Sequence, residues 1–266
     1  MKKYWLIFRL SWQDAITYRL NFLMWRLRSI IGFLASYLFW LALVSSNPNI
    51  AGYNASILLT YIFVAAFLRN LVFSNVSYAA CVEIARGDLS NFLIKPLGYF
   101  KYWLTRDLAD KALNLTFFSI EILVLYFILR PQIILPQTLF HLISFLIISF
   151  LAAIMFFFLS FIISTFAFWH PEHNGWPLRF LFISLLDFLS GSSIPLDIFP
   201  PAIVKLFKFS PFSYLVFYPT QIWLNRVSQT EIVNIFLITL FWVLAFYLIF
   251  RLIWHQGLKT YSAYGR

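Results

Sequence analysis

Three ionisable residues interrupt stretches of sequence that are otherwise apolar: Arg69, Glu121 and Asp187. If these stretches cross a bilayer, each buried charge costs about 2.5–3.5 kcal/mol, so each side chain should face protein or a water-filled cavity. The three groups could line a proton relay or a substrate path. Alternatively, Arg69 could pair with Glu121 or Asp187 and lock two helices together. We favour the lock, because one acid per helix is little material for a relay.

The sequence lacks the motifs of several common kinds of catalytic and nucleotide-binding site. The chain has no G-x-x-x-x-G-K-[ST] sequence to hold ATP phosphates and no H-E-x-x-H zinc motif. It also has no G-x-S-x-G nucleophile motif. Cys81 is the single cysteine, which excludes an intrachain disulfide and a multi-thiolate metal site. His170 and His173 offer too few ligands for a metal. We therefore expect no catalysis, no metal and no cofactor bound by this chain.

The composition is that of a membrane protein. The 266 residues are 62% hydrophobic and 11% charged, and the mean hydropathy is +0.81. Soluble domains carry about 45–50% apolar and about 25% charged residues, so a soluble enzyme, a disordered tail and a secreted disulfide module are excluded. Lys and Arg number 20 against 10 Asp and Glu. We assign this excess to membrane orientation rather than to nucleic acid.

Charge-free stretches predict six transmembrane helices in a single all-α polytopic domain spanning residues 1–266. Ser29–Leu68 contains no charged residue and is long enough for two spans, which separate at the turn-forming residues 45–49. Most Lys and Arg fall on the side that holds both termini, which the positive-inside rule makes cytoplasmic. The predicted spans are about 22–44, 55–79, 112–130, 138–165, 180–194 and 232–250.

The first 20 residues predict an amphipathic helix lying in the membrane plane. At 100° per residue one face collects Tyr4, Trp5, Phe8, Trp12 and Ile16, while most charged residues lie elsewhere. Such a helix is either a simple anchor or an arm that contacts a cytosolic partner.

The segment Val82–Lys111 is too polar to cross a membrane and too apolar to be a free linker. Gly87 allows a tight turn, Asp88 or Ser90 could cap a short helix, and Pro96 would stop it. This helix would have an apolar side made of Leu89, Phe92 and Leu93. It could seat in a groove on a soluble subunit, or it could rest on lipid headgroups.

The segment 189–225 stays apolar although its prolines forbid one continuous helix. Pro201 suits the first turn of a short helix that ends before Pro211. Broken helices at membrane depth must be buried in protein or line a cavity, so this segment predicts re-entrant or interfacial half-helices on the outer side. The simpler interpretation is an ordinary loop lying on lipid.

These features together resemble the permease subunits of bacterial type-2 ATP-binding-cassette exporters, in the viologen-exporter-like branch. Three stretches carry the resemblance over essentially the whole chain: Glu83–Ser90 with Lys95-Pro96-Leu97, Leu189–Leu196 with the later prolines, and the tail 257–265. Family members often have a glycine near the position of Asn225, where this chain has none.

The resemblance implies a six-span half-transporter in the bacterial cytoplasmic membrane. Two permease chains, identical or sister chains, would sit on two copies of a separate ATPase that binds ATP and magnesium. The implied ATPase-coupling residues are Glu83, Gly87, Asp88, Leu89, Ser90, Phe92, Leu93, Lys95 and Pro96. The implied re-entrant segment contains Gly191, Pro195, Pro200 and Pro211, and the amphipathic N-terminal helix would brace the coupling segment.

Two other function classes stay open from the sequence. One is an ATP-independent channel or proton-coupled carrier that uses Arg69, Glu121 and Asp187; the other is a membrane scaffold without transport. A structured cytoplasmic segment in a chain without an ATP site favours the exporter permease. The sequence does not identify the cargo, although its 33 Phe would suit a hydrophobic or amphiphilic molecule.

Overall fold

The computed structural model of the chain describes residues 2–47, 50–173 and 175–261. Over these residues the regular elements are helices. The α-helices are α1 (Lys2–Thr17), α2 (Arg19–Ser46), α3 (Ala55–Val72), α4 (Val76–Arg86), α5 (Leu89–Leu93), α6 (Tyr99–Leu129), α7 (Leu139–Ser164), α8 (Trp176–Leu189), α9 (Pro201–Phe209), α10 (Phe217–Trp223) and α11 (Gln229–Thr260). Short 3₁₀ helices η1 (Thr165–Phe168), η2 (Pro171–His173), η3 (Leu196–Ile198) and η4 (Pro211–Tyr214) connect them.

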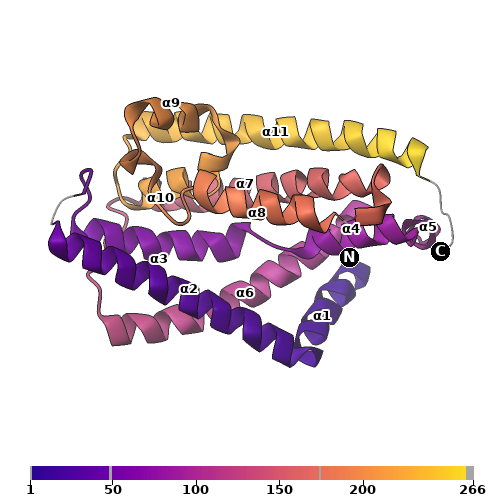
Figure 1. The fold of residues 1–266 in the computed structure, drawn as a ribbon, viewed down its shortest axis with the longest axis horizontal. Coiled ribbons are helices and arrows are strands. Elements are labelled where there is room, and N and C mark those ends of the chain that lie inside the picture. The colour runs from indigo at the N-terminus through magenta and orange to yellow at the C-terminus, as the bar shows by residue number, and fades with distance from the viewer. Residues whose placement is uncertain (1, 48–49, 174, 262–266) are drawn as a thin grey trace.

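The long helices run along one direction and form a bundle (Figure 1). The start of α1 and the end of α11 lie at one end of this bundle, together with α5, while α9 and α10 lie at the other end (Figure 1). Below, these are called the termini end and the far end. Part of the turn predicted at 45–49 and the tail 262–266, which includes the last residues of the tail motif, lie outside the described residues.

Five helical runs among the described residues are long and apolar enough to span a membrane: 19–46, 55–86, 99–129, 139–168 and 229–260. The prediction of an all-α polytopic membrane fold is confirmed. The predicted span 180–194 differs, because α8 has 14 residues and ends at Leu189. At about 1.5 Å per residue it is about 21 Å long, short of the about 30 Å of hydrocarbon. The count of six spans stays a prediction.

Helix α6 begins earlier than predicted. Residues 99–111, which we placed in the cytoplasmic segment, are its first turns, and the helix continues for 31 residues to Leu129. No proline or glycine interrupts the sequence between Gly98 and Arg130, so charged residues near its start do not stop the helix. The polar segment is therefore only the stretch from α4 to Gly98.

The span predicted at 55–79 is broken. Helix α3 ends at Val72 and α4 starts at Val76, with Phe73, Ser74 and Asn75 between them. This break frees the carbonyl of Ser74 from helical hydrogen bonding, and a buried side chain uses it as described below.

The segment 190–228 folds as short helices at the far end. As predicted, a helix begins at Pro201 and ends before Pro211. Gly191 adopts a left-handed φ of +79°, and a Cβ there would lie 2.9 Å from the Tyr61 hydroxyl and from the Phe217 Cβ. Asn225, near which the family resemblance led us to expect a glycine, adopts φ +58°. Asparagine is among the few other residues that enter this region easily.

Candidate functional site

The turn from α4 to α6 forms the tip of the termini end (Figure 1). Gly87 closes α4 with φ +81°, and the N–H of Asp88 donates to the carbonyl of Glu83 at 2.9 Å. This is the Schellman arrangement, in which the left-handed residue is usually glycine. α5 follows at once and ends at Leu93, whose side chain lies outside what the structure describes. Gly87 therefore makes the tight turn that the sequence predicts.

The predicted side-chain cap of α5 is not formed. Asp88 occupies the N-cap position without a side-chain capping bond in the described structure. The Ser90 hydroxyl instead donates to the carbonyl of Gly87 at 2.8 Å. The N–H of Ser90 donates to the hydroxyl of Tyr261 at 3.2 Å. Contacts with the C-terminal segment, rather than a cap, thus fix the start of α5.

Leu89 and Phe92 of α5 face the chain's own core, and not a partner's groove or the lipid headgroups, the two alternatives that the sequence left open. Leu89 is fully buried and Phe92 is 7% exposed. The Phe92 ring lies 5.1 Å from that of Tyr99, which stacks at 5.1 Å on Trp254 of α11. Among the described apolar side chains of this turn, Ile94 projects outward, at 84% exposed, and the exposed Lys95 and Pro96 follow it.

Arg69 on α3 pairs with Asp187 on α8, one of the two locks that the sequence allowed. Its guanidinium Nη1 lies 2.8 Å from Asp187 Oδ1, and its Nη2 donates to Oδ2 at 3.0 Å. Ser192, just after α8, accepts a further bond from Arg69 at 3.5 Å. The Arg69 side chain remains 43% exposed in the single chain.

Glu121 on α6 has a different partner from the one that we considered. Arg26 on α2 clamps it: Nε donates to Oε1 at 2.7 Å and Nη2 contacts Oε2. The remaining guanidinium nitrogen donates to the amide oxygens of Asn70 at 3.2 Å and Asn114 at 3.4 Å. The pair is nearly enclosed, with side chains 6% and 17% exposed. It ties α2, α3 and α6 together deep in the bundle.

A second buried polar cluster surrounds the break between α3 and α4. Lys111 Nζ lies 2.7 Å from Asp107 Oδ2 one turn earlier on α6, and the Ser74 hydroxyl donates to Asp107. Arg179 of α8 donates to the Ser77 hydroxyl at 2.7 Å and to the freed carbonyl of Ser74 at 3.2 Å. The break is thus held by hydrogen bonds from two neighbouring helices.

A polar network joins the far-end segment to the loop after α2. Tyr53 donates to both oxygens of Asp197, at 2.8 and 3.0 Å, and receives a bond from Gln221. The guanidinium of Arg226 lies 3.9 Å above the Tyr53 ring and 3.5 Å from Asp197. Burial raises the pKa of the Asp197 carboxyl, while the hydrogen bond from Tyr53 and the charge of Arg226 oppose this.

Sequence reasoning missed three of these buried charges. We counted Arg26, Lys111 and Arg179 as basic residues of the cytoplasmic side, yet each is at most 5% exposed. A signal was present for two of them. Arg26 lies inside the predicted span 22–44, and Asp107 and Lys111 are one helical turn apart in a run without helix breakers.

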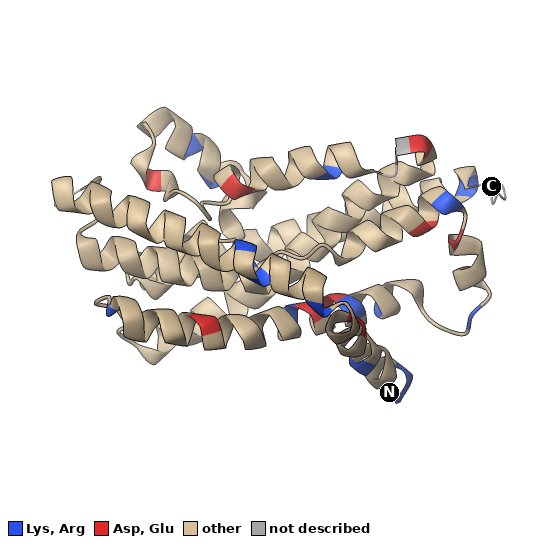
Figure 2. Cartoon of the chain, turned by 60° about the horizontal axis from the view of Figure 1, so that its bottom comes forward, with Lys and Arg blue, Asp and Glu red and all other residues tan. Residues whose placement is uncertain are grey.

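The helices between these clusters carry few charges. Figure 2 shows that much of their length has neither acidic nor basic residues. Over the described residues no group of three or more His, Cys, Asp or Glu side chains is placed to hold a metal. The arrangement is therefore a bundle held by isolated ion pairs, with a short helix firmly supported at one end.

Comparison with known proteins identifies one family. The model of a family described as ABC-2 family transporter protein matches residues 30–265. No curated protein and no solved structure matches the chain.

Proposed function

We infer that this chain, which belongs to the ABC-2 transporter family, is the membrane-spanning permease subunit of an ATP-binding-cassette exporter. It moves a hydrophobic or amphiphilic substrate outward across the bacterial cytoplasmic membrane, and both of its termini are cytoplasmic. A separate ATPase subunit binds ATP and magnesium and supplies the energy. The viologen-exporter-like branch remains a prediction from the sequence motifs.

The main observation in support of this proposal is how α5 packs against the rest of the chain. Leu89 and Phe92 fix the short helix to an aromatic cluster with Tyr99 at the start of α6 and Trp254 near the end of α11. Ile94, the residue that follows α5, projects into solvent. A movement imposed on Ile94 by a partner would therefore be transmitted to two long helices rather than absorbed by a loose loop. This is what mechanical coupling to an ATPase requires.

A second permease chain, identical or a sister chain, fits the position of Arg69. A charge at membrane depth is too costly to leave facing lipid, yet Arg69 is 43% exposed in the single chain. In the proposed dimer, this face of α3 and α8 meets the partner permease or a water-filled path between them.

The test compares two substitutions of exposed apolar residues at opposite ends of the bundle. Ile94→Asp places a charge where the ATPase is proposed to dock, and Leu135→Asp places one at the far end, where the side chain is 67% exposed. An unpaired charge buried at an interface costs several kcal/mol, so we expect Ile94→Asp to lower the amount of bound ATPase at least about tenfold.

Tagged chains would be purified from native membranes, and vanadate-sensitive ATP hydrolysis would be measured with identification of the copurifying P-loop protein. The expected result is a bound ATPase with the wild type and Leu135→Asp, and its loss with Ile94→Asp. ATP hydrolysis by the isolated chain, or transport without any P-loop partner, would refute the proposal.

A further inference from the structure

We propose that the groove between α11 and the start of α6 binds an anionic phospholipid from the leaflet at the termini end of the bundle. The groove has a volume of about 790 Å³ and is lined by Phe100 of α6 and by seven residues of α11: Tyr247, Leu248, Phe250, Arg251, Leu252, Trp254 and His255. The fold and the family match assign no ligand to this groove. It shares Trp254 with the aromatic cluster that supports α5 and lies apart from both intramembrane ion pairs.

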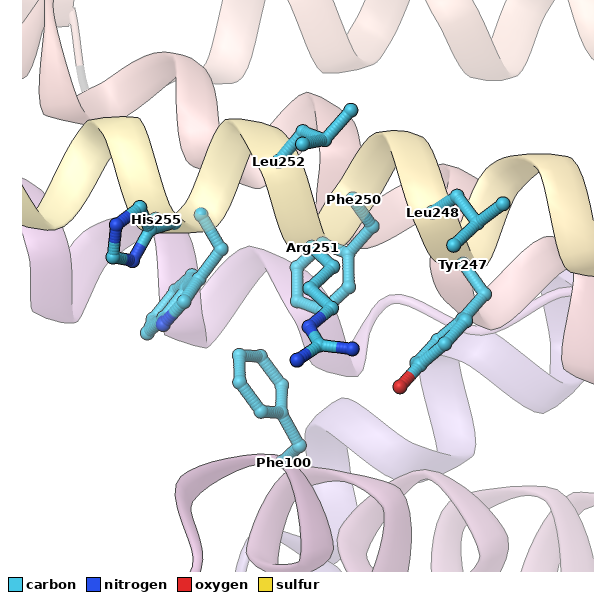
Figure 3. A pocket seen from close by; sticks show the side chains of 8 residues that line it. Phe100, Tyr247, Leu248, Phe250, Arg251, Leu252 and His255 are labelled. Atoms are coloured by element: carbon cyan, nitrogen blue, oxygen red, sulfur yellow. The ribbon is translucent and has the colours of Figure 1, made fainter.

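The side chains that line the groove are suited to bind a lipid with a charged headgroup. Six of the eight lining side chains are aliphatic or aromatic and could contact acyl chains. The other two, Arg251 and His255, lie one helical turn apart on the same face. In Figure 3 the guanidinium of Arg251 extends from α11 into the space opposite Phe100.

The depth of Arg251 matches a headgroup. From Gln229, where α11 begins, to Arg251 the helix rises about 33 Å at about 1.5 Å per residue. This is about the thickness of the hydrocarbon layer. Leu248, one turn before Arg251 and therefore on the hydrocarbon side of it, is 55% exposed on the outer surface of α11, where acyl chains would lie.

The positive charge of the groove lining favours an anionic ligand. None of the lining residues is acidic, and in the described part of the chain no carboxylate lies within 4.0 Å of Arg251 or His255. The N-terminus of the 31-residue helix α6 begins at Tyr99, directly beside the groove, and adds the positive end of a helix dipole. A phosphate here would meet two basic side chains, as in basic pockets between membrane helices.

A second copy of the chain fits this groove less well. A symmetric contact through the groove would place the same surface on both sides. It would then bring Arg251 of each copy close to that of the other, and like charges repel strongly where they are not fully hydrated. A lipid phosphate satisfies the arginine instead.

The experiment measures lipid selectivity of the whole chain in bilayer nanodiscs. Spin-labelled phosphatidylglycerol and spin-labelled phosphatidylcholine would be compared by the immobilised fraction of each. A basic residue near an anionic headgroup favours it by about fivefold, so we expect about fivefold preference for phosphatidylglycerol. The double variant Arg251→Gln with His255→Gln should reduce this preference to about equal binding.

Two further variants distinguish lipid binding in the groove from a general effect of basic residues on the surface. Arg28→Gln removes an exposed basic residue of α2 that also lies over an aromatic ring, 5.1 Å from Trp25, but outside the groove; it should keep the preference. Leu248→Trp narrows the groove without changing charge; it should lower the immobilised fraction. Thermal melting would establish that each variant is folded.

The proposal is overturned if phosphatidylglycerol shows no preference in the wild type, as expected if cargo or another chain fills the groove. It is also overturned if the double variant keeps the preference, or if Arg28→Gln lowers it equally. An unchanged immobilised fraction in Leu248→Trp would show that charge on the surface, and not the groove, holds the lipid.

Discussion

Arg26 on α2 holds Glu121 on α6 by two adjacent guanidinium nitrogens, and the third nitrogen donates to the amide oxygens of Asn70 and Asn114. All three guanidinium nitrogens thus donate hydrogen bonds, and the accepting groups lie on α3 and α6. A lysine has a single ammonium and could not reproduce this bidentate geometry.

The first prediction concerns this clamp. Arg26→Ala would leave Glu121 buried and unpaired, which costs about 3–5 kcal/mol. We expect a large loss of thermal stability and of folded protein in detergent, measured by melting and by size-exclusion chromatography. Arg28→Ala, two residues away and exposed, is the control and should change stability little. The double variant Arg26→Met with Glu121→Leu should recover most of the loss, because it removes both charges. Equal effects of Arg26→Ala and Arg28→Ala would contradict the role of the pair.

The second prediction assigns the partner of Arg69. In a double-mutant cycle, Arg69→Ala and Asp187→Ala should be non-additive, with a coupling free energy of about 0.5–3 kcal/mol. Arg69→Ala and Glu121→Ala should be additive, since Glu121 contacts Arg26 instead. The free energies come from denaturant melts of the purified variants. Non-additivity with Glu121 rather than Asp187 would show that the observed pairing is wrong.

The sequence predicts the positions of helices better than it predicts which charged residues pair. Apolar run length specifies the helices of the membrane region, and proline positions specify the limits of α9. The pairing of charged residues, in contrast, is not determined by the neighbouring sequence. Charge placement indicates that Arg69, Glu121 and Asp187 need partners, but the partner of Glu121 is decided by how α2 packs against α6.

The same reasoning explains the error at α5. Helical periodicity indicates that Leu89 and Phe92 share an apolar side, but it does not tell whether that side contacts the chain's own core or a partner. Both are core residues here because Tyr99 and Trp254 cover them. The exposed Ile94 follows α5, outside the periodic pattern.

The third prediction separates the two sides of α5. Leu89→Asp would bury a charge in the aromatic cluster, so we expect less folded chain whether or not a partner ATPase is present. Ile94→Asp would leave a charge in solvent in the isolated chain and should keep the melting temperature within experimental error. Comparing the melting temperatures of the two purified variants tests this. A stable Leu89→Asp would mean that its side chain is free to contact a partner.

The fourth prediction concerns Gly191. Gly191→Ala would place a Cβ 2.9 Å from the Tyr61 hydroxyl and from the Phe217 Cβ, at a backbone φ of +79°. The left-handed conformation alone costs a non-glycine residue about 1–2 kcal/mol, so we expect a clear loss of stability. Gly32→Ala in α2 is the control, because its added Cβ would meet nothing within 4 Å beyond the adjoining backbone of its own helix. Alanine there should stabilise the helix by about 0.5–1 kcal/mol. Equal behaviour of both variants in thermal melts would argue against close packing at Gly191.

The last prediction concerns Asp197 and pH. Burial raises the pKa of this carboxyl in the folded protein above its ordinary value, and burial also raises the pKa of Tyr53, whose hydroxyl therefore stays protonated and donates to it. Between the ordinary and the raised pKa the folded chain binds more protons than the unfolded chain, so stability falls as pH rises through that window. Asp197→Asn removes the titration but keeps an oxygen that can accept from Tyr53. Melting of both proteins from mildly acidic to neutral pH should show the wild type gaining stability over Asp197→Asn as the pH falls. A difference between the two that stays constant, or that changes in the opposite direction, would show that Asp197 does not titrate in this way.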